Sequence, residues 1–246
     1  MVNRILHKLD EYLSHNDYDS AKRHLHYWKE EAKASQNEQI SLLVHNELMG
    51  LCRKLGEKEQ ALTYAKEALQ TVERMNIAEN TGAATTYLNV ATVYKAFDMA
   101  KEALPLYEKA LKIYEDSLEK NDSRFSGLYN NMALALVDVK RFEEAKKLYS
   151  KALQILQFHP GSEPEQAITY LNLANAAETE LGAEASENII NTYLEQAMQL
   201  LNISESETDG NYAFVCEKCA PVFGYFGYFY FENELKMRAR RIYERA

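Results

Sequence analysis

A small residue recurs in this chain at a nearly constant distance, and this repeat restricts the fold more than any other feature. Ala21, Ala61, Ala103 and Ala145 each follow a short turn-like segment and each lie near the start of an amphipathic stretch. The successive spacings are 40, 42 and 42 residues. A fixed period between about 20 and 50 residues is typical of solenoids, in which each unit buries its apolar face against the next unit.

The best-formed copy of the repeat spans residues 87–115 and predicts two amphipathic helices joined by a tight turn. Its apolar residues recur every three or four positions, so they share one face of each helix. They are Tyr87, Val90, Ala91 and Tyr94 in the first helix, and Ala103, Tyr107, Ala110, Leu111 and Tyr114 in the second. No alternating β-branched runs lie between the copies, which excludes βαβ units and predicts an all-α fold.

The next copy repeats the same residue types at the same places. It carries Tyr129, Met132, Ala133 and Leu136, then Phe142, Ala145, Tyr149 and Ala152. This pattern resembles the tetratricopeptide repeat, with an aromatic, Leu, a small residue and Tyr on the first helix, and Ala, an aromatic and Ala on the second. The usual repeat has about 34 residues. The longer period here is similar to that of kinesin-light-chain-type repeats and of bacterial proteins built almost wholly of such repeats.

The resemblance implies a right-handed α-solenoid of about six antiparallel helix pairs. We expect one solenoid domain over residues 1–246, with repeats at about 2–35, 38–75, 81–117, 123–158, 164–202 and 209–246.

Four irregularities interrupt the pattern. Trp28 stands where the other second helices have a small residue, as expected of an atypical terminal repeat. Pro105 predicts a kink or local adjustment in a second helix, and Pro221 is expected to split the first helix of the last repeat. Four extra residues around positions 181–188 predict a longer turn in the fifth repeat.

An asparagine series is the strongest functional signal. Asn89, Asn131 and Asn172 each follow the tyrosine of their repeat by two residues, so they should lie along one face of the solenoid. The resemblance implies that the first helices line a concave groove, where such asparagines bind the backbone of an extended peptide. An amide side chain both donates and accepts hydrogen bonds, so it fits any peptide backbone. The alternative is that these asparagines bond between adjacent helices.

Five more residues should flank the same peptide-binding surface. They are Thr92, Lys95, Asn130, Asn175 and Glu178.

Composition excludes several classes of function. The net charge of −9 argues against a nucleic-acid partner, which requires a basic face. No apolar stretch approaches the roughly 18 residues that a membrane span needs. Three cysteines are too few for a disulfide framework and indicate a reducing cytoplasm. No nucleophile–base pair or phosphate-binding motif is present, so we expect no catalytic residue, metal or cofactor.

Three other features have competing interpretations. Cys216 and Cys219 have the spacing of a metal or redox motif, but on a helix two such cysteines usually pack as small hydrophobic residues. Residues 163–209 contain ten acidic residues and no Lys or Arg, which indicates either a solvated face or a site for a basic partner. The aromatic block at residues 223–231 predicts a thick core, a peptide pocket or a homodimer contact through the C-terminal repeat.

These patterns together predict a non-catalytic adaptor or scaffold that binds a protein or peptide segment in the groove. The alternative is a peptide-responsive sensor of the bacterial type, acting through a partner protein. A metal or redox protein using Cys216 and Cys219 is the third hypothesis.

Overall fold

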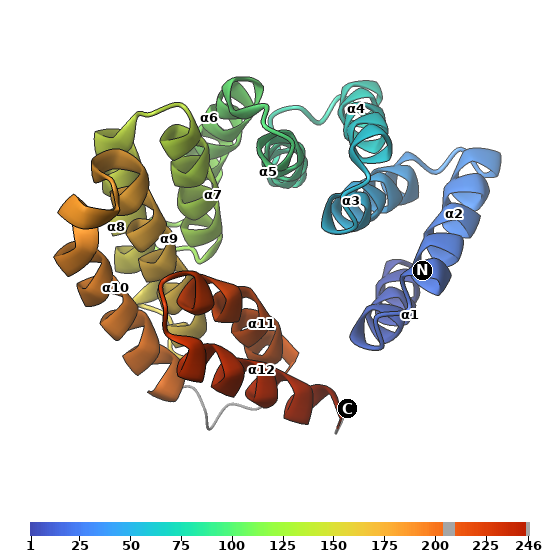
Figure 1. The fold of residues 1–246 in the computed structure, drawn as a ribbon. Coiled ribbons are helices and arrows are strands. Elements are labelled where there is room, and N and C mark those ends of the chain that lie inside the picture. Colours follow the sequence, from blue (N-terminus) through green and yellow to red (C-terminus); the bar gives the residue numbers. More distant parts are fainter. Residues whose placement is uncertain (204–209, 245–246) are drawn as a thin grey trace. The chain divides into compact units, whose positions relative to one another are not determined.

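The computed structural model describes residues 1–203 and 210–244, and within these residues it contains twelve helices and no strand (Figure 1). The helices follow one another as antiparallel pairs, which confirms the predicted all-α fold of about six helix pairs. The chain forms two compact units, unit 1 (Met1–Lys120) and unit 2 (Asn121–Ala246). That all 246 residues form one solenoid domain stays a prediction.

Each unit contains three helix pairs. Unit 1 has α1 (Val2–Ser14), α2 (Tyr18–Ala34), α3 (Glu38–Lys54), α4 (Lys58–Arg74), α5 (Thr81–Ala96) and α6 (Ala100–Ser117). Unit 2 has α7 (Arg124–Asp138), α8 (Phe142–Leu156), α9 (Glu163–Leu181), α10 (Ala183–Ile203), α11 (Gly210–Tyr225) and α12 (Phe229–Tyr243).

The turns within all the pairs except α9–α10 share one backbone motif. Asp98, between α5 and α6, has a φ of 65°, and its N–H donates to the carbonyl of Lys95 at 3.2 Å. The next N–H, that of Met99, donates to the carbonyl of Tyr94 at 3.0 Å. This pair of bonds is the Schellman motif, which ends a helix through one left-handed residue. The same two bonds occur at the left-handed residues Asn16, Gly56, Lys140 and Gly227.

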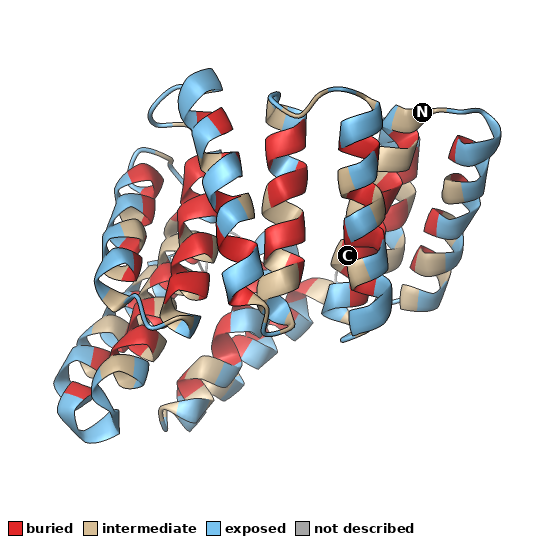
Figure 2. Ribbon diagram, turned by 90° about the horizontal axis from the view of Figure 1, so that it is seen from above, coloured by how far each residue is buried: buried red, intermediate tan, exposed pale blue. Residues whose placement is uncertain are grey.

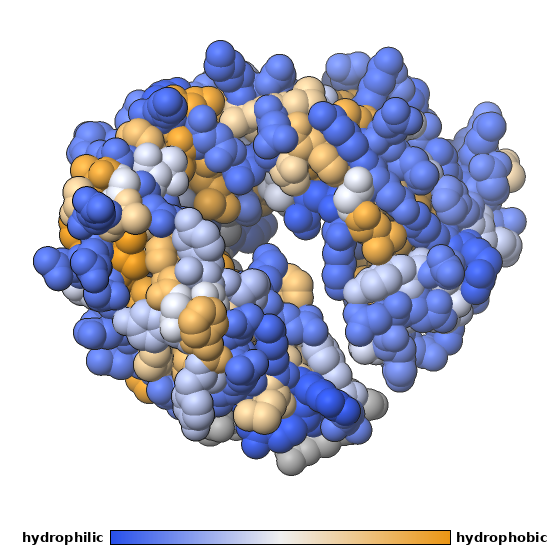
Figure 3. Space-filling model, in the orientation of Figure 1, coloured by the Kyte–Doolittle hydropathy of each residue, from blue (hydrophilic) through white to orange (hydrophobic). Residues whose placement is uncertain are grey.

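Small residues and tyrosines form the core on the facing sides of the helices (Figure 2). Ala61, Ala103 and Ala145 are completely buried, and so are the rings of Tyr107 and Tyr149. A methyl side chain lets the paired helix approach closely, while a buried ring fills the wider gap between pairs. On the face seen in Figure 3 most side chains are hydrophilic and the hydrophobic ones gather in patches.

The four extra residues of the fifth pair lengthen a helix instead of a turn, so the expectation of a longer turn was wrong. Gly182, with a φ of 81°, alone separates α9 from α10. Helix α10 has 21 residues, whereas α6 and α8 have 18 and 15. Four residues make about one helical turn. The insertion therefore leaves the buried face in register, and Leu194 and Ala197 remain fully buried.

Both internal prolines lie in continuous helices, so the expected split at Pro221 was wrong. Pro105 lies within α6 and Pro221 within α11. Each proline removes one N–H that would bond to the carbonyl four residues earlier. Those carbonyls belong to Lys101 and Glu217, which are exposed residues, so water can take the place of the missing donor.

Candidate functional site

A cavity of about 330 Å³ in unit 2 brings together side chains from the first helices of three consecutive pairs. Asn130 and Asn131 reach it from α7, Asn172 from α9, and Lys218 and Val222 from α11. Three of the asparagines that the sequence singled out therefore line one cavity. Because the three helices belong to successive repeats, their equivalent faces meet on the same side of unit 2.

Asn130 connects α7 to α9 through both ends of its amide. Its Nδ2 donates to the Oγ1 of Thr169 at 2.6 Å. Its Oδ1 accepts from the Nδ2 of Asn172 at 3.3 Å. These bonds fix the amide planes of Asn130 and Asn172 at the wall of the cavity, so the two side chains are oriented before any ligand arrives.

Unit 1 contains the same bond pattern at the corresponding positions. The Nδ2 of Asn46 donates to the Oγ1 of Thr86 at 3.1 Å, and its Oδ1 accepts from the Nδ2 of Asn89 at 2.9 Å. An asparagine of one first helix thus bonds to the Thr and Asn of the next first helix, three residues apart. Asn89 and Asn172 therefore do bond between adjacent helices, as the alternative interpretation expected, and peptide binding by them stays a prediction.

Asn131 differs from the other two members of the series. Its Nδ2 donates to the carbonyl of Gly127 in its own helix, at 2.9 Å. No bond to a neighbouring helix is found for Asn131 among the described residues. Asn131 lines the cavity without joining two helices there.

The remaining predicted residues lie in different settings. Thr92 accepts from the hydroxyl of Tyr107 at 3.2 Å, which places it inside the α5–α6 pair. Lys95 occupies the last turn of α5. On α9, Asn175 is half-buried and Glu178 lies close enough to Tyr225 of α11 to raise the pKa of that phenol. Asn89, Thr92 and Lys95 thus belong to unit 1, and the other five predicted residues belong to unit 2.

Sequence reasoning missed the apolar walls of the cavity. Leu134 on α7, Ile168 on α9 and Val222 on α11 line it together with the amides. A signal for them was present, because Leu134, Ile168 and Val222 lie four residues from Asn130, Asn172 and Lys218. Residues four apart share one helix face.

Comparisons with known proteins agree with this arrangement. The family model described as "Tetratricopeptide repeat" matches residues 41–116, and a second model of the same description matches residues 127–157. The chain therefore carries tetratricopeptide repeats over these two ranges. No curated protein sequence matches this chain significantly.

Two solved structures share the tetratricopeptide-repeat fold. BtubC (BKLC) from P. vanneervenii is 21% identical, with a TM-score of 0.59, over 93% of this chain and 90% of that chain. A kinesin light chain-like protein with nearly identical TPR-like repeats from Podosopora anserina is 17% identical, with a TM-score of 0.54. That match covers 82% of this chain and 94% of the other. Tetratricopeptide repeats bind protein partners and are generally non-catalytic, so the fold supports a protein-interaction or scaffold role.

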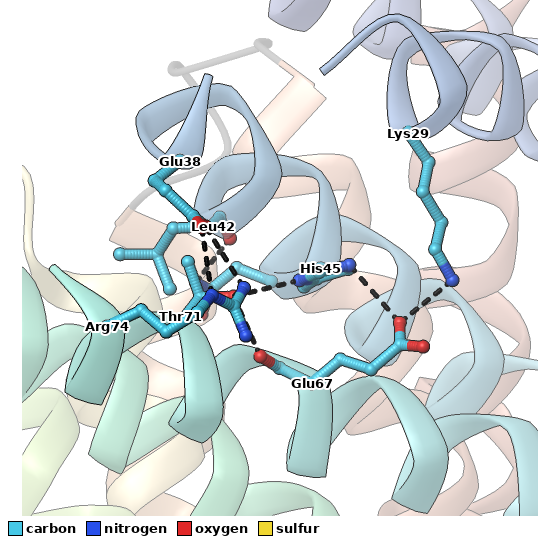
Figure 4. A network of polar contacts seen from close by, with 8 residues as sticks. Lys29, Glu38, Leu42, His45, Glu67, Thr71 and Arg74 are labelled. Atoms are coloured by element: carbon cyan, nitrogen blue, oxygen red, sulfur yellow. Dashed lines mark hydrogen bonds and ion pairs between the residues drawn. The ribbon is translucent and has the colours of Figure 1, made fainter. Parts of the chain in front are cut away.

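A second cavity, of about 560 Å³, lies in unit 1 between α2, α3 and α4. Figure 4 shows the polar network on its wall. Glu67 of α4 accepts from the Nζ of Lys29 at 2.8 Å, and the same oxygen lies 3.2 Å from the Nε2 of His45. Arg74 of α4 forms a two-pronged pair with Glu38 of α3, at 2.8 and 3.0 Å. Because these groups satisfy one another, the network joins three helices and is a structural tie.

The buried imidazole of this network makes the stability of unit 1 depend on pH. His45 is 7% exposed, and burial lowers its pKa below the usual 6.5, against the opposing effect of Glu67. The unfolded chain therefore takes up this proton first as the pH falls, which favours unfolding. We expect the free energy of unfolding to decrease as the pH drops below 6.5, and His45→Gln to reduce that decrease.

Urea unfolding of the wild-type protein and of His45→Gln between pH 7.5 and pH 5.5 measures how far the free energy of unfolding falls in each. Lys29 and Arg74 act in the same direction as burial, and Glu38 acts with Glu67 in the opposite direction. A wild-type protein and a His45→Gln variant with the same pH slope would contradict the prediction.

The two cysteines of α11 are part of the repeat core. Cys216 and Cys219 are 0% and 1% exposed, and burial raises the pKa of the Cys219 thiol. In the part of the chain that the structure describes, no group of three or more His, Cys, Asp or Glu residues could hold a metal ion.

None of the described helices is both long and apolar enough to span a membrane.

Proposed function

We propose that unit 2 binds an extended peptide segment of a partner protein in the cavity lined by α7, α9 and α11, and that the protein acts as a non-catalytic adaptor. The meeting of Asn130, Asn131 and Asn172 in one cavity carries this proposal. Peptide backbones offer alternating donors and acceptors, and amide side chains complement both.

The walls of the cavity indicate what kind of segment fits. Leu134, Ile168 and Val222 supply apolar surface beside the amides. Ligand sites in proteins commonly combine such apolar walls with a few oriented polar groups. A peptide that places one apolar side chain between these three residues, with its backbone along Asn131 and Asn172, uses both kinds of surface.

The fixed amides support binding as well as orientation. Asn130 already bonds to Asn172 and to Thr169, so ligand binding costs little side-chain entropy of the protein at Asn130 and Asn172. A reducing cytoplasmic location is part of the same proposal, because the three cysteines are buried and form no disulfide.

Asn131→Ala should weaken peptide binding about tenfold without lowering the free energy of unfolding. The substitution removes a hydrogen-bonding pair offered to the ligand, an effect of about 1.5 kcal/mol, and breaks no bond between helices. Peptides selected from a random library on the wild-type protein would be titrated against the variant by fluorescence anisotropy. Asn188→Ala, an exposed asparagine on α10, is the matched control and should bind like the wild type.

A second variant tests the apolar wall of the same cavity. Val222→Glu places a carboxylate among Leu134 and Ile168 and should abolish binding of the selected peptides. If the peptides bind Asn131→Ala, Val222→Glu and Asn188→Ala equally well, the cavity of unit 2 is not the binding site.

A further inference from the structure

The first helix pair contains a cavity that the peptide-binding proposal does not use. It has a volume of about 430 Å³ and is lined by residues of α1 and α2 only. Its lining residues are Arg4, His7, Lys8, His24, Tyr27 and Trp28. Two permanent cations, two imidazoles and two aromatic rings thus meet there, and no carboxylate is among them.

The place of Trp28 in the repeat explains why this pair differs from the others. Trp28 lies seven residues after Ala21, and the matching positions of the next three pairs hold Ala68, Ala110 and Ala152. Those three alanines are fully buried between close helices. Where the other pairs have a methyl group, the neighbouring helix can come close. The indole ring of Trp28 fills that space instead. Helix α1 accordingly buries only Ile5 and Leu9, and polar side chains of the pair border open space.

The aromatic rings and cations of the cavity are held in contact. The guanidinium of Arg4 lies 5.2 Å from the centre of the Trp28 ring, and Tyr27 packs edge-on against Trp28 at 5.4 Å. The Nε2 of His24 donates to the carbonyl of Ile5 at 3.0 Å. The imidazole is therefore anchored to α1, and the ring of Tyr27, which is 57% exposed, forms the open border.

Arg4 has unused capacity for an anion. Stacking on a ring engages the flat face of a guanidinium and leaves its N–H edge available for a carboxylate. Among the described residues, the Arg4 side chain forms no hydrogen bond or ion pair, and its guanidinium lies over the ring of Trp28. Lys8 is paired with Glu11 at 2.7 Å, but both side chains are exposed. Such exposed pairs contribute little, so an incoming anion can compete for Lys8.

We propose that this cavity, between Arg4, Lys8 and the Tyr27–Trp28 rings, binds a peptide segment that carries acidic side chains. Carboxylates complement a site with cations and without acids. A nucleic acid offers negative charge too, but the net charge of −9 on the whole chain repels a long polyanion. A short acidic segment needs only the local positive charge of Arg4 and Lys8 on the cavity wall.

Trp28 provides a direct measurement, because it is the only tryptophan of the chain. A hexaglutamate peptide added to the full chain at low salt should change the emission of Trp28 with a saturable curve. Arg4→Gln should weaken that binding about tenfold, as expected for the loss of a charged hydrogen-bond donor. Arg4→Lys should retain part of the affinity. Added salt should weaken binding, because the attraction at this exposed site is screened.

Arg23→Gln is the matched control, since Arg23 is an exposed arginine of α2 that bonds to Ser20 and does not line the cavity. This variant should bind hexaglutamate like the wild type. Equal weakening by Arg4→Gln and Arg23→Gln would overturn the proposal, because it would indicate nonspecific attraction. An emission change that does not saturate would overturn it as well. If a deoxythymidine oligonucleotide of equal charge binds as tightly as hexaglutamate, the site is not selective for an acidic peptide, and the proposal is overturned in favour of a nucleic acid.

Discussion

Replacing Arg238 with alanine should lower the free energy of unfolding by about 3 to 5 kcal/mol, the usual cost of removing one partner from a buried charged network. Arg238 of α12 is 4% exposed. Its Nη1 donates to the carbonyl of Leu201 at 3.1 Å and to the hydroxyl of Tyr212 at 2.9 Å. Its Nη2 donates to the Oδ1 of Asn202 at 2.9 Å and pairs with Glu234.

These bonds connect three helices of unit 2 through one side chain. Leu201 and Asn202 belong to the last turn of α10, and Tyr212 belongs to the first turn of α11. The last carbonyls of a helix lack partners within it, and a positive charge near them is favourable. Without the guanidinium, the partly exposed Glu234 loses its cation, and the carbonyl of Leu201 is left with its bond from the hydroxyl of Tyr212.

Arg240→Ala is the matched control for Arg238→Ala. Arg240 lies two residues further along α12 and pairs with Glu244 on the solvent-exposed side of the helix. Its loss should leave the urea midpoint, followed by circular dichroism, nearly unchanged. Similar midpoints for Arg238→Ala and Arg240→Ala would show that the buried network contributes no more than an exposed pair.

The repeat pattern in the sequence was sufficient to predict the class of fold. The spacing of Ala61, Ala103 and Ala145 depends on local rules, namely the period of the helix and the turn that ends it. Each helix pair obeys these rules separately, so the prediction did not need long-range contacts. The fifth pair shows a feature that these local rules do not determine. Whether four residues extend a turn or a helix depends on packing against α9, and the sequence around Gly182 does not state it.

The candidate site was predictable in its residue types and not in its contacts. The series of Asn89, Asn131 and Asn172 shares a helix position, which the sequence shows. Which amides bond across helices depends on the partner residue in the next repeat. Asn89 and Asn172 donate to the Oδ1 of Asn46 and Asn130, and the position that matches these two acceptor asparagines in the repeat between them holds Leu88, whose side chain offers no acceptor. Asn131 accordingly bonds within its own helix and lines the cavity.

Arg238 shows that the contacts of a charged residue are equally hard to predict from the sequence. In the sequence it belongs to a basic cluster with Lys236, Arg240 and Arg241, and such clusters usually mark solvated surface. The structure buries it against α10 instead. Lys146 of α8, not a C-terminal cation, pairs with Glu180 of the acidic segment at residues 163–209, at 2.8 Å.

Phe223→Ala should lower the free energy of unfolding by about 3 to 5 kcal/mol, and this result would separate core from interface within the aromatic block. Phe223 is fully buried in α11, and its ring centre lies 4.7 Å from that of Phe231 in α12, edge to face. Truncation would leave a cavity between the two helices of the last pair. Such edge-to-face ring pairs also add stability beyond the buried area.

Tyr230→Ala is the contrasting variant, because Tyr230 belongs to the same block and is 85% exposed. With Tyr225 and Phe229, which are 68% and 64% exposed, it forms an aromatic patch at the α11–α12 turn. Because so little of this side chain is covered in the monomer, its removal should leave the urea midpoint of a dilute sample unchanged. If the patch is a homodimer contact, the wild-type midpoint rises with protein concentration and that of Tyr230→Ala does not, since association stabilises only the folded chain. A loss of stability in Tyr230→Ala equal to that in Phe223→Ala, at the lowest concentration, would contradict the division of the block into a buried part and an exposed part.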